Sequence, residues 1–93
     1  IELKQKEDKI INLQQELLHI YPNPTTSKIN VVAKETFLSS INLLDVLGRT
    51  LKTIEVNDLS VTVDVSSLPA GVYILKTVFE GGTTIKTDRI VKQ

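Results

Sequence analysis

The amino-acid sequence predicts an all-β domain, a compact two-sheet β-sandwich of about six or seven short strands, with one amphipathic helix before it. Three observations lead to this prediction. The spacing of apolar residues changes from a helical period to a period of two shortly after residue 20. Two prolines stand at that junction, and short segments with glycine or proline separate the later apolar runs. The length of 93 residues allows one small domain and an appendage.

Residues 1–20 carry the helical pattern. Their apolar residues fall on the a and d positions of a heptad repeat, with Lys6 as the one polar interruption. These predicted coiled-coil interface residues are Leu3, Ile10, Leu13, Leu17 and Ile20. A helix of about 20 residues is only marginally stable alone, so its apolar stripe must be covered. We expect either self-association, as the end of a coiled-coil stalk in a homodimer or homotrimer, or packing against the domain that follows.

Pro22 and Pro24 end the predicted helix, because proline lacks an amide donor and clashes with the preceding helical turn. The residue before each proline is biased toward an extended conformation. The sequence therefore predicts two parts, an amphipathic helix over residues 1–20 and a β-sandwich over residues 21–93. We expect the ring of Tyr21 to pack on the sandwich, with its hydroxyl group reaching a polar partner or solvent.

Alternating apolar and polar residues mark the strands. The runs are KINVV, SINLLDV, SVTVDV, GVYILKTVFE and TTIKTDRIVKQ. The alternation predicts one buried face made of Ile29, Val31, Ile41, Leu43, Val61, Val63 and Val65. The run GVYILKTVFE is apolar on both faces, which predicts a central strand. One of its faces carries Tyr73, Leu75 and Phe79.

The segments between these runs have the chemistry of tight turns. In DVLGR, Gly48 stands where a short loop needs a positive φ, and Asp45 and Arg49 can pair across it. Such an exposed pair is worth only about 0–1 kcal/mol. In SLPAG, Pro69 presets φ at a turn and Gly71 precedes the next strand. EGGT is a Gly-Gly hairpin signal.

Composition argues against several functional classes. The formal net charge is +0, with 11 basic and 11 acidic residues, so bulk charge favours neither nucleic acid nor anionic lipid as a partner. The chain has no cysteine and one histidine, His19, which we expect in the last helical turn as a capping or surface residue. We therefore expect no enzyme activity, no metal site and no cofactor. No apolar run approaches the roughly 18 residues that span a bilayer, so we expect no direct membrane insertion.

Four motifs in a fixed order resemble one family. They are YPNP at residues 21–24, LLDVLGR at 43–49, LPAGVYILK at 68–76 and KTDRIVKQ at 86–93. Together they resemble the type A C-terminal sorting domain of the type IX (Por) secretion system of Bacteroidota, over about residues 20–93. The chain lacks an initiating Met and a signal peptide, and we interpret it as a fragment of a longer protein.

This resemblance implies an immunoglobulin-like sandwich that directs a cargo protein across the outer membrane. The cargo would cross the periplasm, meet the translocon and its shuttle components, and end on the outer-membrane surface or in the medium. A cell-surface sortase would cleave the domain near residues 17–21 and attach the cargo to an anionic lipopolysaccharide. The motif residues carried over by position are Tyr21, Pro22, Asn23, Pro24, Asp45, Gly48, Arg49, Leu68, Pro69, Gly71, Tyr73, Lys86, Arg89, Ile90, Val91 and Lys92.

The terminal strand offers one hypothesis for recognition. An edge strand has unpaired backbone groups to which a receptor can add a strand. Lys86, Arg89 and Lys92 would guard such an edge, and with the tail at residues 90–93 they would form the docking surface.

Two other functions remain open from the sequence. One is a structural oligomerisation module, in which a coiled-coil stalk is capped by the sandwich. The other is an adhesive or carbohydrate-binding sandwich, which usually exposes aromatic clusters, whereas this chain has no Trp and two Tyr.

Overall fold

The computed structural model describes residues 18–82 and 85–93, and in these residues it contains seven β-strands and no helix. The strands are β1 (Leu18–Tyr21), β2 (Lys28–Ala33), β3 (Leu38–Leu44), β4 (Thr50–Asp58), β5 (Ser60–Asp64), β6 (Gly71–Phe79) and β7 (Ile85–Lys92). Within the described residues, no helix could cross a membrane. The predicted coiled-coil positions Leu3, Ile10, Leu13 and Leu17 lie outside the described residues.

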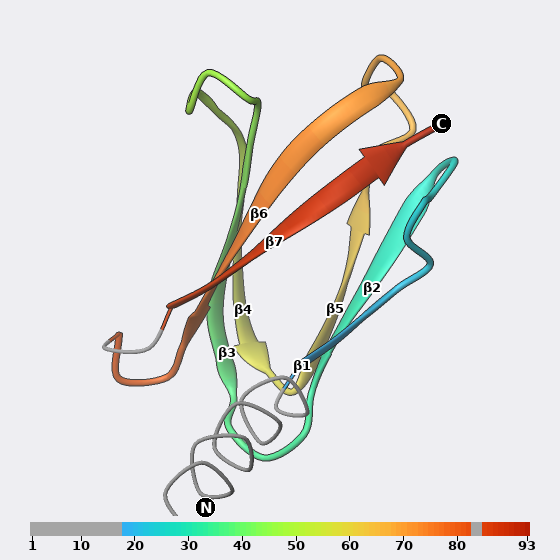
Figure 1. Cartoon of the computed structure of the whole chain (residues 1–93). Coiled ribbons are helices and arrows are strands. Elements are labelled where there is room, and N and C mark those ends of the chain that lie inside the picture. The colour runs from blue at the N-terminus through green and yellow to red at the C-terminus, as the bar shows by residue number, and fades with distance from the viewer. Residues whose placement is uncertain (1–17, 83–84) are drawn as a thin grey trace, which may run out of the picture.

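The strands form two sheets, which confirms the predicted sandwich (Figure 1). One sheet has the order β1-β2-β5 and the other the order β4-β3-β6-β7, and every strand pair is antiparallel. With β4 beside β3, this arrangement corresponds to the A-B-E and C′-C-F-G sheets of an immunoglobulin-like sandwich. The two sheets leave β1 and β7 as edge strands on one side and β5 and β4 as edge strands on the other.

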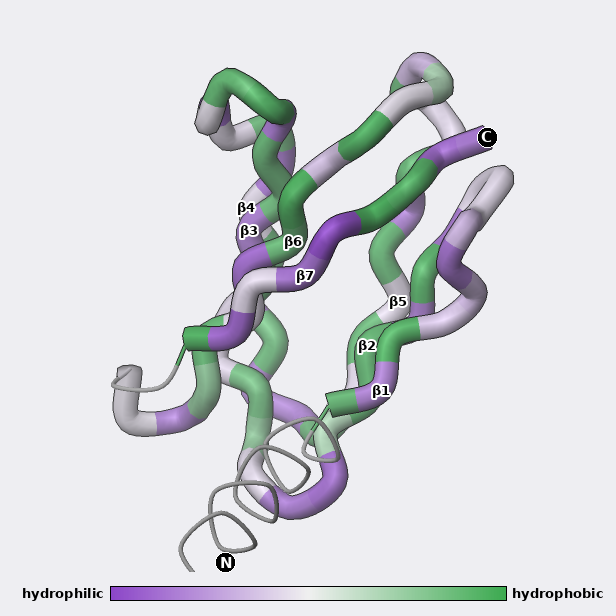
Figure 2. Tube along the Cα trace, in the orientation of Figure 1, coloured by the Kyte–Doolittle hydropathy of each residue, from purple (hydrophilic) through white to green (hydrophobic). Residues whose placement is uncertain are grey.

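The core lies between the sheets and consists of alternate residues from every sheet strand but β4. Its most completely buried hydrophobic side chains are those of Ile29, Val31, Leu38, Ile41, Leu43, Val63, Val65, Leu75 and Ile90. The predicted alternation is confirmed, since only Val61 of the predicted face is partly rather than fully buried. Strand β6 is an inner strand between β3 and β7, as its two apolar faces predict. Figure 2 shows the apolar segments recurring along the strands, with a polar segment in the loop between β2 and β3.

Strand β1 corrects the predicted end of the helix. Residues 18–20 are extended and pair with β2, with Leu18 opposite Ala33 and Ile20 opposite Val31. Leu18 is buried among the core side chains, and Ile20 packs partly against them. A heptad pattern cannot distinguish these two residues from strand residues, because they are two positions apart and therefore also share one face of a strand.

The predicted position of His19 also changes. His19 lies in β1 rather than in a helical turn, and its ring lies edge-on to that of Tyr21, with centroids 4.9 Å apart. Tyr21 is 45% exposed, so its side chain is partly covered and partly open to solvent. Both side chains are exposed to solvent, and β1, which carries them, is an edge strand.

Candidate recognition surface

The predicted motif segments gather at one end of the sandwich. Because the strands are antiparallel, the ends of β1, β3 and β7 and the start of β6 lie at the same end (Figure 1). Gly71 at the start of β6 lies opposite Lys92, and Leu44 at the end of β3 lies opposite Ile74. We call this end, formed by residues 21–25, 45–49, 68–71 and 89–93, the motif end. Of the predicted motif residues, only Lys86 lies near the other end.

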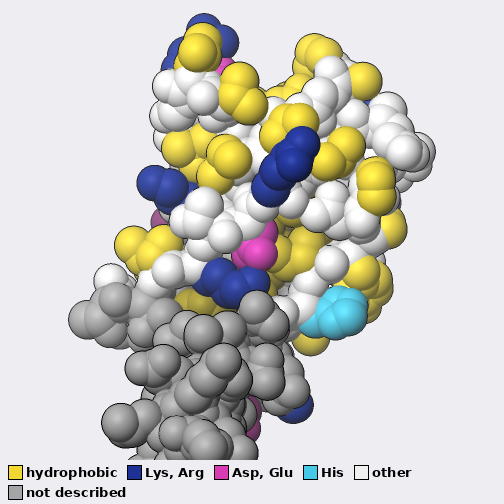
Figure 3. All heavy atoms as spheres, viewed as in Figure 1, with side chains coloured by type: hydrophobic (Ala, Val, Ile, Leu, Met, Phe, Trp, Pro, Cys, Tyr) yellow, Lys and Arg dark blue, Asp and Glu magenta, His cyan; other side chains and the backbone are white. Residues whose placement is uncertain are grey.

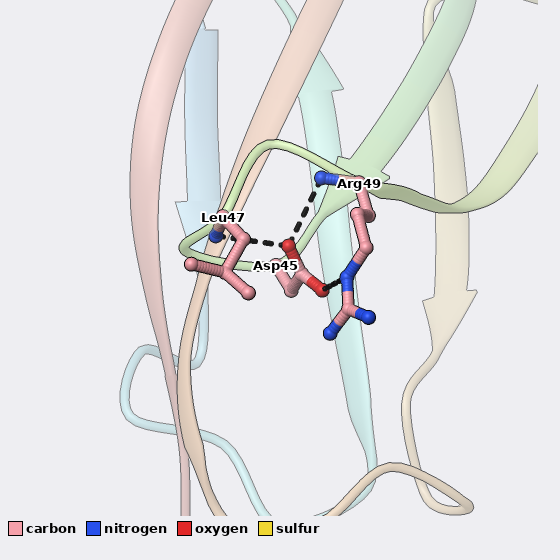
Figure 4. Close-up of polar contacts among 3 residues, drawn as sticks. All are labelled: Asp45, Leu47 and Arg49. Carbon is pink, nitrogen blue, oxygen red and sulfur yellow. Dashed lines mark hydrogen bonds and ion pairs between the residues drawn. The ribbon is translucent and has the colours of Figure 1, made fainter.

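The turn between β3 and β4 is held by the carboxylate of Asp45 (Figure 4). Its Oδ1 accepts hydrogen bonds from the backbone amides of Leu47 and Arg49, both at 2.9 Å. Its Oδ2 accepts a third from the Arg49 Nε at 2.6 Å. The backbone closes the turn as well, since the amide of Gly48 donates to the Asp45 carbonyl at 3.0 Å. Gly48 has φ +86°, as the predicted turn requires.

These contacts favour the charged form of Asp45. The backbone amide of Arg49, more than any other contact, lowers the pKa of the Asp45 carboxyl group below its usual value. The Asp45 side chain is only 14% exposed, whereas that of Arg49 is 73% exposed. The predicted ion pair is therefore present, and the carboxylate is its inner member.

Asn23 and Thr25 connect the YPNP segment to β7. The Asn23 side-chain amide donates to the Arg89 carbonyl at 2.8 Å, and its oxygen accepts from the Val91 amide at 3.0 Å. Two residues later the backbone continues this pairing, because the Thr25 amide donates to the Val91 carbonyl and the Gln93 amide donates to the Thr25 carbonyl. Both peptide bonds before Pro22 and Pro24 are cis. The YPNP segment thus lies along the edge of β7.

Thr25 is a residue that the sequence analysis did not single out. It is 2% exposed, its hydroxyl group donates to the Lys28 carbonyl at 2.7 Å, and it forms a parallel bridge to Lys92. The hydroxyl group bonds within its own turn, a role that threonine commonly takes. The sequence TTS after the second proline could have suggested such a turn, but nothing in it indicated the long-range pairing with β7.

The LPAG segment forms a corner between the two sheets. The Tyr73 hydroxyl group donates to the Pro69 carbonyl at 2.6 Å, and the Leu68 amide donates to the Val65 carbonyl at 3.0 Å. A tyrosine that bonds back to the backbone a few residues upstream is the tyrosine corner of immunoglobulin-like sandwiches. Lys92 also reaches this corner, since its Nζ donates to the Leu68 carbonyl at 3.2 Å. The corner therefore joins β5, β6 and β7.

The hypothesis of a free terminal edge is wrong for the tail of β7. Ile90 is fully buried, and the outward backbone groups of Arg89, Val91 and Gln93 bond to Asn23 and Thr25. The Nζ of Lys92 is used by backbone carbonyls. Only residues 85–88 lack backbone hydrogen bonds on that side to other described residues. Deleting residues 90–93 would therefore remove core and sheet contacts, and could not isolate a docking surface.

Lys86 pairs with Asp88 at 2.9 Å along β7, away from the motif end. Among residues 18–82 and 85–93 there is no group of three or more His, Cys, Asp or Glu side chains that could hold a metal ion.

Comparison with known proteins bears on the whole sandwich. The sequence model of the family described as "Secretion system C-terminal sorting domain" matches residues 19–93. No curated protein matches the chain. Among solved structures, the chain is similar to PorZ, described as an essential bacterial surface component of the type-IX secretion system of Porphyromonas gingivalis. The TM-score is 0.64 at 18% identity, over 82% of this chain and 11% of PorZ, so this likeness shows the fold alone.

Proposed function

Because the chain belongs to the secretion system C-terminal sorting domain family, we propose that it is the export signal of a longer cargo protein and that the type IX translocon reads it. The observation that carries this proposal is the match of the family over residues 19–93, which coincides with the sandwich. The gathering of the sequence motifs at one end supports it, since recognition needs a contiguous surface. Family membership implies a secreted or cell-surface protein.

The finer steps follow the order that a type A sorting domain implies. The folded sandwich crosses the periplasm with its cargo, and shuttle components and the translocon bind it there. A surface sortase then removes it and attaches the cargo to lipopolysaccharide. The four motifs in their order support the type A assignment.

The cleavage that we propose falls before strand β1. A protease needs an extended backbone that it can reach, and residues 18–21 are paired with β2 in strand β1. Leu18 is 5% exposed and belongs to the core. We therefore place cleavage at or before Leu17 and not within β1.

The coiled-coil stalk is a separate proposal, because its predicted interface lies almost wholly outside the described residues. Sedimentation of residues 1–93 against residues 18–93 tests it. Concentration-dependent association of the longer chain alone would assign oligomerisation to residues 1–17, and association of neither would remove the stalk from the account.

An export assay tests the sorting function. A fluorescent reporter with a periplasmic signal would carry residues 1–93 at its C-terminus, in a type IX-competent bacterium and in a translocon mutant of the same strain. We expect reporter at the surface or in the medium of the competent strain and in the periplasm of the mutant. Equal export by both strains, or retention by both, would contradict the proposal.

A further inference from the structure

The turn between β3 and β4 exposes apolar side chains at its tip. Val46 is 68% exposed and Leu47 is 76% exposed, and these are the two most exposed large hydrophobic side chains among the described residues. Leu51, which follows in β4, is 43% exposed. Turn tips are usually occupied by Gly, Asn, Asp, Ser or Pro. Figure 2 shows this turn at the upper left, with a hydrophobic stretch beside intermediate and hydrophilic ones.

The turn is also ordered by its own hydrogen bonds. Five bonds join Asp45 to the backbone amides of Leu47 and Gly48 and to three groups of Arg49 (N, O and Nε). A loop held in one conformation before binding loses less conformational entropy when it binds. The tip therefore presents its two aliphatic side chains at a small entropic cost.

Arg49 adds a charged group beside this apolar tip. Only its Nε is used by Asp45, and its other two guanidinium nitrogens make no hydrogen bond to a described residue. In Figure 4 the side chains of Leu47 and Arg49 leave the turn on opposite sides of Asp45. A guanidinium group with a free edge is suited to pairing with a carboxylate. Figure 3 shows hydrophobic and basic side chains together at this tip.

The charges at the two ends of the sandwich indicate which sign of charge the partner surface carries. Basic side chains near the motif end are those of Lys28, Arg49, Lys52, Arg89 and Lys92, and acidic ones are those of Asp45 and Asp64. The opposite end carries Glu35, Glu55, Asp58 and Glu80 with Lys34 and Lys86, and Lys86 is paired with Asp88. The motif end is therefore the basic end, and complementary potentials favour a partner surface that is acidic around its apolar part.

We propose that the β3–β4 turn is the docking element of the sorting domain. Val46 and Leu47 enter an apolar pocket on a protein of the translocon, and the free edge of the Arg49 guanidinium pairs with a carboxylate at the rim of that pocket. This inference rests on the proposed function, and it adds which surface is read and which chemistry reads it. Arg is among the residues enriched at binding interfaces and hot spots, and a few side chains that fill desolvated pockets carry most of the binding energy.

The export reporter with residues 1–93 tests this inference by substitution. In Val46→Thr/Leu47→Thr both anchors become polar, Val46 at the same size and Leu47 with one heavy atom fewer, and we expect at least about a tenfold loss of export, as for a hot spot. The matched control is Ile85→Thr, which changes a 58% exposed side chain at the other end and should export within about twofold of wild type. Because all three side chains are exposed, the urea midpoints should stay close to wild type.

Two substitutions of Arg49 test the role of its guanidinium group. Arg49→Gln removes the positive charge, whereas Arg49→Lys keeps the charge but loses the planar set of guanidinium donors. We therefore expect export to decrease from wild type to Arg49→Lys and further to Arg49→Gln. If wild type is exported and the double Thr variant is exported equally well, the docking inference is wrong while the sorting function stands. An equal loss with Ile85→Thr would also overturn it. Absence of export for wild type would remove the sorting function itself.

A photo-crosslinking side chain identifies the occupant without depending on the amount exported. It is placed at position 47 and, as control, at position 37, whose Phe is 42% exposed and precedes β3 at the opposite end. In exporting cells we expect crosslinks to a translocon protein from position 47 and not from position 37. Crosslinks from position 47 only to a second copy of the chain, or to the translocon only from position 37, would overturn the proposal.

Discussion

Asn23 acts as a substitute for a peptide group at the edge of β7. Its side-chain nitrogen donates to the Arg89 carbonyl, and its side-chain oxygen accepts from the Val91 amide. Both of these backbone groups would otherwise face outward from an edge strand. The asparagine in YPNP therefore has a structural role, the pairing of the β7 edge, that a turn preference alone does not explain. Asparagine can both donate and accept in one planar group, whereas aspartate can only accept.

Asn23→Ala should lower the free energy of unfolding by about 1–3 kcal/mol, because two backbone groups lose their partner. Hydrogen exchange of the Val91 amide should become faster in the same variant. The matched control is Asn42→Ala, which removes one side-chain bond to Thr53 on the outer face of a sheet. A smaller loss of stability for Asn23→Ala than for Asn42→Ala would contradict this role.

Tyr73 is the second residue with a specific structural role. Tyr73→Phe removes the bond to the Pro69 carbonyl and leaves the ring in the core, so we expect a loss of about 0.5–1.5 kcal/mol in urea unfolding. Tyr21→Phe is the control, since Tyr21 is 45% exposed and its hydroxyl group bonds to no described residue. Equal stability of the two variants would show that the corner bond contributes nothing.

The lowered pKa of Asp45 predicts that the domain loses stability in acid. Its pKa is lower in the folded chain than in the unfolded chain, chiefly because of the Arg49 amide, so the unfolded state binds its proton first. This stabilisation is present above about pH 4 and is lost as pH falls through the lowered folded pKa. Asp64, whose pKa is lowered chiefly by Ser66, adds to the same loss.

Urea unfolding between neutral pH and about pH 2 measures this effect. Asp45→Asn should lose less stability across that range than wild type, because one linked carboxyl group is gone. A carboxyl resonance of Asp45 that titrates at the same pH in folded chain and in urea would contradict the assignment.

At the scale of single elements, β1 is the clearest departure from the sequence prediction. The heptad pattern extended the helix to residue 20, but pairing with β2 outweighs local helical preference once prolines end the segment at residue 21. The other strands were predictable, because residues such as Ile41, Leu43 and Val63 alternate on a half-buried sheet with a period of two.

The pairing of β7 with the YPNP segment was not predictable in the same way. The contacts of Asn23 with Arg89 and Val91 join residues 66 and 68 positions apart, and no local period reports such a distance. The Asp45–Arg49 contact was predictable because both residues lie in one turn. The motif positions were therefore visible in the sequence, whereas their gathering at one end required the fold.

Strand β1 predicts a boundary for the folded unit. Residues 18–93 should unfold cooperatively, whereas residues 22–93 should be markedly less stable, because Leu18 and the backbone partners of β2 are removed. Loss of the buried Leu18 side chain alone corresponds to about 2–5 kcal/mol. Thermal unfolding of both fragments checks this, and equal midpoints would show that β1 is dispensable.

At the scale of the whole molecule, the sandwich separates its two ends. The motif end is closed by side-chain bonds that tie the segment between β1 and β2, the β5–β6 corner and β7 together, and it carries the hydrogen-bonded apolar turn. Of the exposed acidic groups in the part of the chain that the structure describes, most lie at the opposite end. Such a domain can fold independently of its cargo and still present one oriented surface to the export machinery.

The most direct test of the sandwich as the export signal compares residues 18–93 with residues 1–93. Each is placed on the same periplasmic reporter, and export is measured in the same type IX-competent strain. We expect equal export, lost in both cases in a translocon mutant, because the sandwich alone is the signal. Retention of the 18–93 reporter in the periplasm, with the domain folded, would contradict it and would place part of the signal in residues 1–17.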